Sequence, residues 1–137
     1  LALGEGVLRP FELSTAAQRA APVRAALLLA AAKLRPAPVT LVVPWLQDSA
    51  PEVVRAAAYV IARNRLPGGV RALLAQRAHP DEEVRQHVAR ALARTQVGDS
   101  LSAPAIEALR VLLTDPSERV RVNAVRSAAT HGDALAE

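Results

Sequence analysis

Apolar and polar positions follow the period of an α-helix in four stretches of the chain that begin alike. Each stretch opens with a Val-Arg pair, and apolar or small residues recur four, seven and eight positions after the valine. This spacing places them on one side of a helix, which we call the apolar stripe. The valines are Val23, Val54, Val84 and Val120, and the stripe residues are Leu27, Ala30 and Ala31; Ala58, Ile61 and Ala62; Val88, Ala91 and Leu92; and Ala124, Ser127 and Ala128. We therefore predict four valine-led helices that each bury one side.

The chain repeats a unit of about thirty residues, because the first three valines are evenly spaced and the fourth follows after a slightly longer interval. A shorter apolar segment precedes each of the last three valine-led helices, and it predicts a first helix over 38–47, 69–77 and 104–114. The equivalent segment of the first unit, over 11–20, has the weakest pattern. The longer interval indicates an insertion, which we place at Gly98–Ala103 because glycine and serine cluster there as in a loop.

Proline and acidic residues mark the start of the valine-led helices. A proline is tolerated in a first turn because its missing N–H has no partner inside the helix there. Carboxylates at the same place cap free N–H groups and complement the positive end of the helix dipole. The prolines are Pro22, Pro51, Pro80 and Pro116, and the acids are Asp48, Glu52, Asp81, Glu82, Glu83, Asp115 and Glu118. Pro44 lies inside the predicted helix over 38–47 and should kink it.

This arrangement resembles the HEAT-repeat family, in particular the short bacterial HEAT-like repeats of the phycobilin lyase type. The string Asp115-Pro-Ser-Glu-Arg-Val120-Arg121 carries the resemblance, and weaker copies precede the earlier Val-Arg pairs. The resemblance implies an all-α fold, a right-handed α-α superhelix (α-solenoid) of about four helix pairs. We expect a single array cut from a longer protein, with approximate units 1–9 (the end of a preceding repeat), 10–34, 35–65, 66–97, 98–132 and 133–137 (the start of a following helix).

The composition is consistent with a helical fold and excludes several classes of functional site. Hydrophobic residues make up 51% of the chain but aromatic residues only 2%, so alanine, leucine and valine must build the core. The chain has no cysteine, which excludes disulfides and thiolate sites. His79, His87 and His131 lack the short spacing of a zinc site, and no phosphate-loop or nucleophile-elbow motif is present. We expect no enzyme activity, no catalytic residue, no metal, no cofactor and no membrane span.

An arginine follows each of the four valines, at Arg24, Arg55, Arg85 and Arg121. One interpretation is an anion-binding ladder. The resemblance implies the other, in which such arginines bridge neighbouring repeats by pairing with acids at helix starts, such as Asp48, Asp81 or Asp115. We assign the four arginines to the architecture.

A partner-binding surface is expected where the valine-led helices point away from the apolar stripe. The resemblance implies that these second helices line a concave groove, so residues six and ten positions after the valine would face a partner. Position six holds Leu29, Val60, Arg90 and Arg126, which makes the groove apolar near the first two units and basic near the last two. The candidate binding residues are Lys33, Arg63, Asn64, Arg90, Arg94 and Arg126. An ordinary solvated face is the alternative interpretation.

The leading hypothesis for function is a non-catalytic scaffold that binds a peptide or protein in the groove, with an acidic partner fitting its basic half. One alternative is an accessory repeat module of a larger enzyme of the peptidyl-prolyl isomerase or chromophore lyase type. The second is binding of a nucleic-acid backbone, since 17 basic residues outnumber 13 acidic ones. Against it, Phe11, Trp45 and Tyr59 are the only aromatic residues available for base stacking, and the chain has no lysine-rich tail. The oligomeric state stays open.

Overall fold

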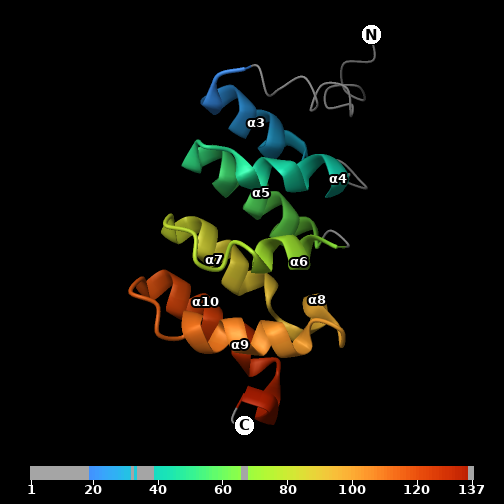
Figure 1. Ribbon diagram of the computed structural model, residues 1–137, viewed down its shortest axis with the longest axis vertical. Coiled ribbons are helices and arrows are strands. Elements are labelled where there is room, and N and C mark those ends of the chain that lie inside the picture. Colours follow the sequence, from blue (N-terminus) through green and yellow to red (C-terminus); the bar gives the residue numbers. More distant parts are fainter. Residues whose placement is uncertain (1–18, 32, 34–38, 66–67, 136–137) are drawn as a thin grey trace.

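The computed structural model describes residues 19–31, 33, 39–65 and 68–135, and within these ranges every regular element is a helix (Figure 1). In chain order the elements are α3 (Ala21–Ala31), α4 (Val39–Val42), the 3₁₀ helix η2 (Val43–Gln47), α5 (Pro51–Asn64), α6 (Gly69–Leu74), α7 (Glu82–Ala91), α8 (Arg94–Val97), α9 (Ser102–Leu112), α10 (Glu118–Ala129) and the 3₁₀ helix η3 (Gly132–Leu135). The predicted helix over 11–20 falls almost entirely outside the described residues. No described helix has the length and apolar character needed to cross a bilayer.

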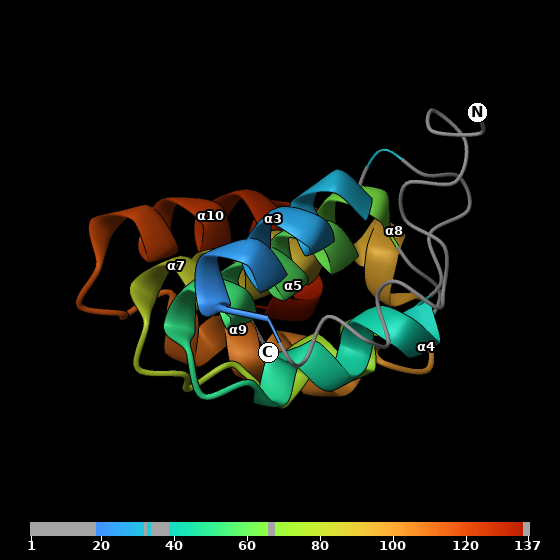
Figure 2. The same ribbon diagram turned by 90° about the horizontal axis from the view of Figure 1, so that it is seen from above.

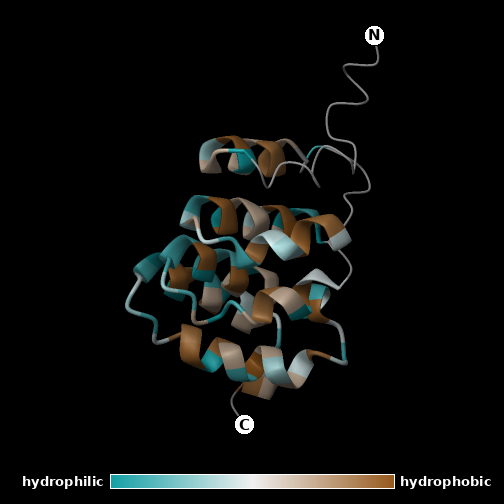
Figure 3. Cartoon of the chain, turned by 45° about the horizontal axis from the view of Figure 1, so that its top comes forward, coloured by the Kyte–Doolittle hydropathy of each residue, from teal (hydrophilic) through white to brown (hydrophobic). Residues whose placement is uncertain are grey.

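The valine-led helices α3, α5, α7 and α10 follow one another along the molecule, and each packs against the next (Figures 1 and 2). The elements η2, α6 and α9, which precede α5, α7 and α10 in the chain, pack beside them as a second layer. Hydrophilic residues gather on the loops that lead into α5, α7 and α10 (Figure 3). The described part of the chain is therefore an all-helical fold in which each valine-led helix packs against the next one along the chain.

The apolar stripes form the centre of the structure in α5, α7 and α10. Val54, Val84 and Val120 are at most 1% exposed, and the stripe residues that follow them in α5 and α7 are buried. The core is made of valine, leucine, isoleucine and alanine, as the composition requires. The first unit departs from this pattern, because Val23 is 41% exposed. The prediction that all four valines occupy equivalent buried positions is therefore wrong for α3, which has a described valine-led neighbour on one side only.

Pro44 divides the segment that was predicted as one kinked helix over 38–47. The α-helix α4 ends at Val42, and η2 continues with Pro44 in its first turn. Proline has no N–H to donate to the preceding turn, so the chain changes to a 3₁₀ helix instead of bending a continuous α-helix. Leu46 of η2 is still buried in the core.

The third unit contains a break that the repeat pattern did not predict. Helix α7 ends at Ala91, and Ala93 takes an extended conformation with φ −61° and ψ 146° before α8 begins. Gly98 has a positive φ of 66°, which glycine adopts at little cost, and the turn it opens leads into α9 at Ser102. The insertion predicted at Gly98–Ala103 is thus partly a turn, while Ser102 and Ala103 belong to α9.

The starts of the valine-led helices differ in how their N–H groups are capped. Asp81 is the N-cap of α7, and its Oδ1 accepts hydrogen bonds from Glu83 N at 2.9 Å and Val84 N at 3.1 Å. Asp48 and Asp115 precede the N-cap residues and accept instead from the backbone N–H two residues on. The expectation that all three aspartates cap helices directly is therefore correct only for Asp81. The other two shape the loops.

Candidate binding surface

Three arginines of the valine-led helices reach the aspartate ahead of the next valine-led helix. Arg24 donates to Asp48 through Nε (3.1 Å) and Nη2 (3.0 Å), and Arg85 donates in the same two-pronged way to Asp115 (2.8 and 3.1 Å). Arg55 makes one hydrogen bond, from Nη1 to Asp81 Oδ2 at 2.9 Å. The ion pairs expected from the repeat are thus present at three successive helix junctions.

These contacts lower the pKa of two of the bridging aspartates, Asp48 and Asp115. Burial by itself would raise the pKa of Asp115, but the hydrogen bond from Arg85, the backbone N–H of Ser117 and the charges of Arg85 and Arg121 together bring its pKa below the usual value. Asp48 has a lowered pKa on the same grounds, with Arg24 and Ala50 as donors. Asp115 in turn raises the pKa of Arg85. The Arg24–Asp48 and Arg85–Asp115 ion pairs therefore stabilise the packing between helices. Because their charges are already paired, they are poorly suited to bind a charged partner.

Arg121 occupies the fourth position of this series with different contacts. Its Nη1 donates to the carbonyl oxygens of Asp115 (2.7 Å) and Pro116 (3.1 Å), as Arg85 Nη1 does to those of His79 and Pro80. No carboxylate lies within ion-pair distance of Arg121 among the described residues. Arg121 therefore keeps the hydrogen bonds to backbone carbonyl oxygens that Arg85 makes. Among the described residues it has no equivalent of the ion pair between Arg85 and Asp115.

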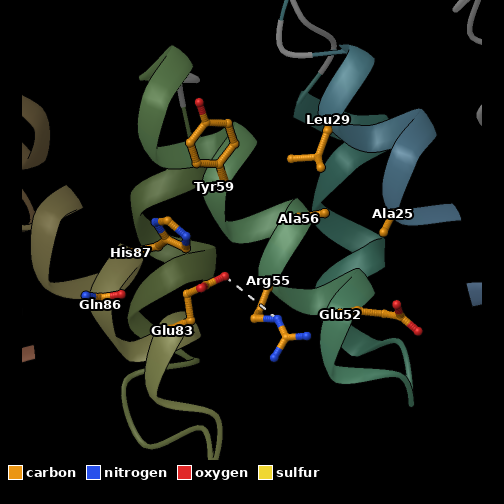
Figure 4. A pocket seen from close by; sticks show the side chains of 9 residues that line it. All are labelled: Ala25, Leu29, Glu52, Arg55, Ala56, Tyr59, Glu83, Gln86 and His87. Carbon is orange, nitrogen blue, oxygen red and sulfur yellow. Dashed lines mark ion pairs between the residues drawn. The ribbon is translucent and has the colours of Figure 1, made fainter. Parts of the chain in front are cut away.

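A hollow of about 460 Å³ lies across α3, α5 and α7, and its lining is shown in Figure 4. We call it the hollow. Three consecutive valine-led helices contribute side chains to it, which makes it a surface of the array and not of one helix pair. The lining residues are Ala25 and Leu29 from α3; Glu52, Arg55, Ala56 and Tyr59 from α5; and Glu83, Gln86 and His87 from α7.

One end of the hollow is apolar. Leu29 leaves 45% of its surface exposed, and Ala25 and Ala56 offer only methyl groups beside it. The Tyr59 ring completes this end and meets the His87 ring edge to face, with centroids 5.5 Å apart and planes at 70°. Small alanines next to larger Leu29 and Tyr59 leave room in which a partner's side chain can be buried.

The other end of the hollow is charged. Arg55 Nε lies 3.7 Å from Glu83 Oε2, and their side chains are 39% and 54% exposed. Glu52 lies in the first turn of α5, and Figure 4 shows it on the side of Arg55 opposite Glu83. These groups stand in the same first turns that carry acids for the helix dipole. They also give this end of the hollow more carboxylates than cations.

His87 is uncharged at neutral pH. Burial is the main cause that lowers its pKa to about 4, and the charge of Arg90 lowers it further. The imidazole therefore adds no positive charge to the hollow. No group of three or more His, Asp or Glu side chains suited to a metal ion occurs in the described part of the chain.

The residues predicted to line the groove lie in several different environments. Arg90 and Arg126 are exposed in the last turns of α7 and α10, and Arg126 borders a second hollow on α10 with Val122 and Val125. Leu29 lines the hollow, as position six predicts. Val60 is fully buried, so its predicted place in the groove is wrong.

The predicted positions ten residues after the valine fall at or beyond the ends of their helices. Lys33 follows the last residue of α3, and Arg63 and Asn64 lie in the last turn of α5, the first exposed and the second half-buried. Arg94 is the first residue of α8, after the helical conformation of α7 has ended. Its backbone N–H donates to Thr130 Oγ1 at 2.8 Å. Its placement on the same helix face as Arg90 is therefore wrong. The structure does not bring the six candidates together into one site.

Sequence reasoning missed Glu52, Ala56, Tyr59, Glu83 and His87. At 100° per residue, positions two before, two after and nine after the valine lie roughly opposite the apolar stripe, as position six also does. Glu52 and Ala56 occupy the first two of these positions in α5. Counting from the centre of the stripe would have found them. Tyr59 and His87 lie off that line, at the boundary between helices.

Comparison with known families places the C-terminal half of the chain. A sequence model of HEAT repeats matches residues 70–136, a range that runs from α6 to the end of η3. A search of curated proteins found no match.

Proposed function

Residues 70–136 belong to the HEAT-repeat family, and on this basis we propose that the chain is a non-catalytic scaffold that binds a peptide or protein segment. HEAT repeats generally mediate protein–protein interactions. The observation that carries the proposal is the hollow, because it is lined by three consecutive valine-led helices and has the exposed Leu29 and the partly buried Tyr59 in its wall. Such a surface is continuous along the array and suits an extended segment better than a small molecule.

The proposal includes the arrangement of the array. We propose a right-handed superhelix of about four helix pairs, with α3, α5, α7 and α10 on its concave side and unit boundaries close to 34, 65 and 97. The order in which these helices pack supports it, and so do the three arginine–aspartate bridges at equivalent places. On this reading the HEAT repeats extend before residue 70.

The exposed arginines favour neither an acidic partner nor nucleic acid by themselves. Arg63, Arg90 and Arg126 each lie in the last turn of their helix, where a positive charge compensates the negative end of the helix dipole. That role explains their exposure without a ligand. The hollow, by contrast, exposes apolar surface that no helix requires, and it therefore takes precedence as the binding site.

The proposal is tested by selecting random phage-displayed peptides on the immobilised chain. Leu29→Asn removes apolar contact from the hollow without adding charge, and Val111→Asn on α9 is a matched control because Val111 is 67% exposed. We expect selected peptides to bind the Leu29→Asn chain about tenfold or more weakly, since a buried leucine contributes about 1.5–3 kcal/mol, and to bind the control normally. Equal loss in both variants, or no loss in either, would contradict it.

A further inference from the structure

The apolar end of the hollow leaves part of the Leu29 side chain uncovered. Leu29 is 45% exposed, although it lies between neighbouring helices, and the facing residue of α5 is Ala56. An alanine in that place leaves Leu29 with no large apolar neighbour on this side. A leucine, isoleucine or valine of a partner would fill the space between Leu29 and Tyr59 and bury both.

The charged end has more negative than positive groups. Glu52 and Glu83 line this end together with Arg55, and Asp81 lies beside the hollow as a second ion-pair partner of Arg55. Asp81 is fully used, because it caps α7 and pairs with Arg55. Glu52 has no ion pair among the described residues, and Glu83 reaches Arg55 only at 3.7 Å with 54% of its side chain exposed. Two carboxylates are therefore available to a ligand.

Nearby cations do not cancel this charge. Arg24 and Arg85 are bonded to Asp48 and Asp115 by two hydrogen bonds each. His87 lines the hollow as a neutral ring. An acidic partner would bring further negative charge beside Glu52 and Glu83, whereas a basic partner would be attracted to them.

We propose that the hollow recognises a protein segment in which an aliphatic residue is followed or preceded by lysine or arginine. The aliphatic side chain packs on Leu29, Ala56 and Tyr59, and the cation pairs with the carboxylate of Glu52 or of Glu83, which lie on either side of Arg55. This inference rests on the proposed function and specifies its partner. It replaces the acidic partner expected from Arg90 and Arg126 with a basic one.

The test uses fluorescein-labelled Gly-Ser peptides that carry a Leu-Arg, a Leu-Glu or a Ser-Arg pair, titrated with the chain by fluorescence anisotropy. We expect the Leu-Arg peptide to bind about tenfold more tightly than either other peptide, which is the change that turning charge attraction into repulsion or losing one aliphatic contact supports. Raising the salt concentration should weaken the binding of the Leu-Arg peptide.

The matched variants are the double change Glu52→Gln with Glu83→Gln and, as control, Glu118→Gln in the first turn of α10. The double variant should lose the preference for Leu-Arg over Leu-Glu, and the control should keep it. The inference is overturned if the Leu-Glu peptide binds as well as the Leu-Arg peptide, if none of the three binds, or if the double variant keeps the preference. If the basic-peptide inference fails but phage-selected peptides still bind the Leu29→Asn chain more weakly, the proposed scaffold function stands without the inference. If those peptides do not depend on Leu29 either, the scaffold function and the inference both fail.

Discussion

The junction between α5 and α7 and the junction between α7 and α10 each contain an arginine–aspartate ion pair at the same repeat position. The surroundings of the two ion pairs differ. Arg55 makes a single hydrogen bond to Asp81, and 39% of its side chain is exposed. Arg85 makes two to Asp115 and two more to backbone carbonyls, with the side chains of the pair only 14% and 7% exposed. The same residue types at the same repeat position therefore make an open contact in one place and a closed one in the other.

The α7–α10 junction also contains polar contacts that the α5–α7 junction lacks. Ser127 Oγ donates to Ala89 O at 2.6 Å, and His131 Nε2 lies 2.8 Å from Leu92 O. Because a carbonyl oxygen only accepts, the Nε2 of His131 carries the proton. These carbonyls belong to the last turn of α7, where a helix leaves oxygen atoms without internal partners. The carbonyl groups at the early end of α7 are thus hydrogen-bonded by α10 and by His131 after it, whereas the α5–α7 junction contains the partly buried Tyr59–His87 contact and the hollow.

The largest expected effect is at Val84, which is fully buried in the apolar stripe of α7, the helix common to both junctions. Val84→Asp would place an unpaired carboxylate in the core, and we expect it to lower the free energy of unfolding by about 3–5 kcal/mol. Thermal melting followed by circular dichroism measures this. Val125→Asp, at a site that is 56% exposed, is the control. Similar melting of both variants would show that the two valines are not in different environments.

The second comparison is between Arg85→Ala and Arg55→Ala. Removing Arg85 leaves Asp115 buried without its partner, so we expect a loss of about 2–3 kcal/mol. Removing Arg55 should cost less, about 1 kcal/mol, because its ion pair with Asp81 is more exposed and has a single hydrogen bond. Urea unfolding of both variants gives the difference. Equal losses would mean that exposure does not distinguish the two junctions.

The third prediction concerns pH and His87 at the open junction. The unfolded chain binds a proton on this histidine with a pKa near 6.5, while the folded chain holds its pKa at about 4. Between these values the unfolded state binds more protons, so stability is full above pH 6.5 and falls by about 2–3 kcal/mol as the pH drops to 4.5. His87→Gln should flatten this part of the profile, measured by urea unfolding from pH 7 to 4.5. A wild-type slope in the variant would assign the effect to another group.

The fold could be predicted to a large extent because its determinants are local and repeated. The Val-Arg register located α5, α7 and α10, and it placed an acid within reach of Arg24, Arg55 and Arg85. What it could not predict depends on neighbours. Val23 has the sequence of a core valine yet is exposed, and the end of α7 at Ala91 follows from no breaker residue in the sequence.

The candidate site was predicted less well, for a geometric reason. Periodicity gives the direction of the buried stripe, but it does not tell how far each neighbouring helix covers the sides. Position six is occupied by Val60, which is fully buried, and by Arg90, which is exposed, so the same place in the repeat has opposite surroundings. The hollow depends on alanines at the right places, and alanine carries no signal of binding in a sequence rich in it.

The turn after α8 has a practical consequence. The extra residues of the last repeat are accommodated at Gly98–Leu101, where Gly98, Asp99 and Ser100 are all exposed, and α7 and α10 still pack against each other. The number of residues in this turn therefore does not affect how α7 packs against α10. An epitope or a small reporter domain inserted between Asp99 and Ser100 would therefore project from the surface without disturbing the packing of α7 against α10.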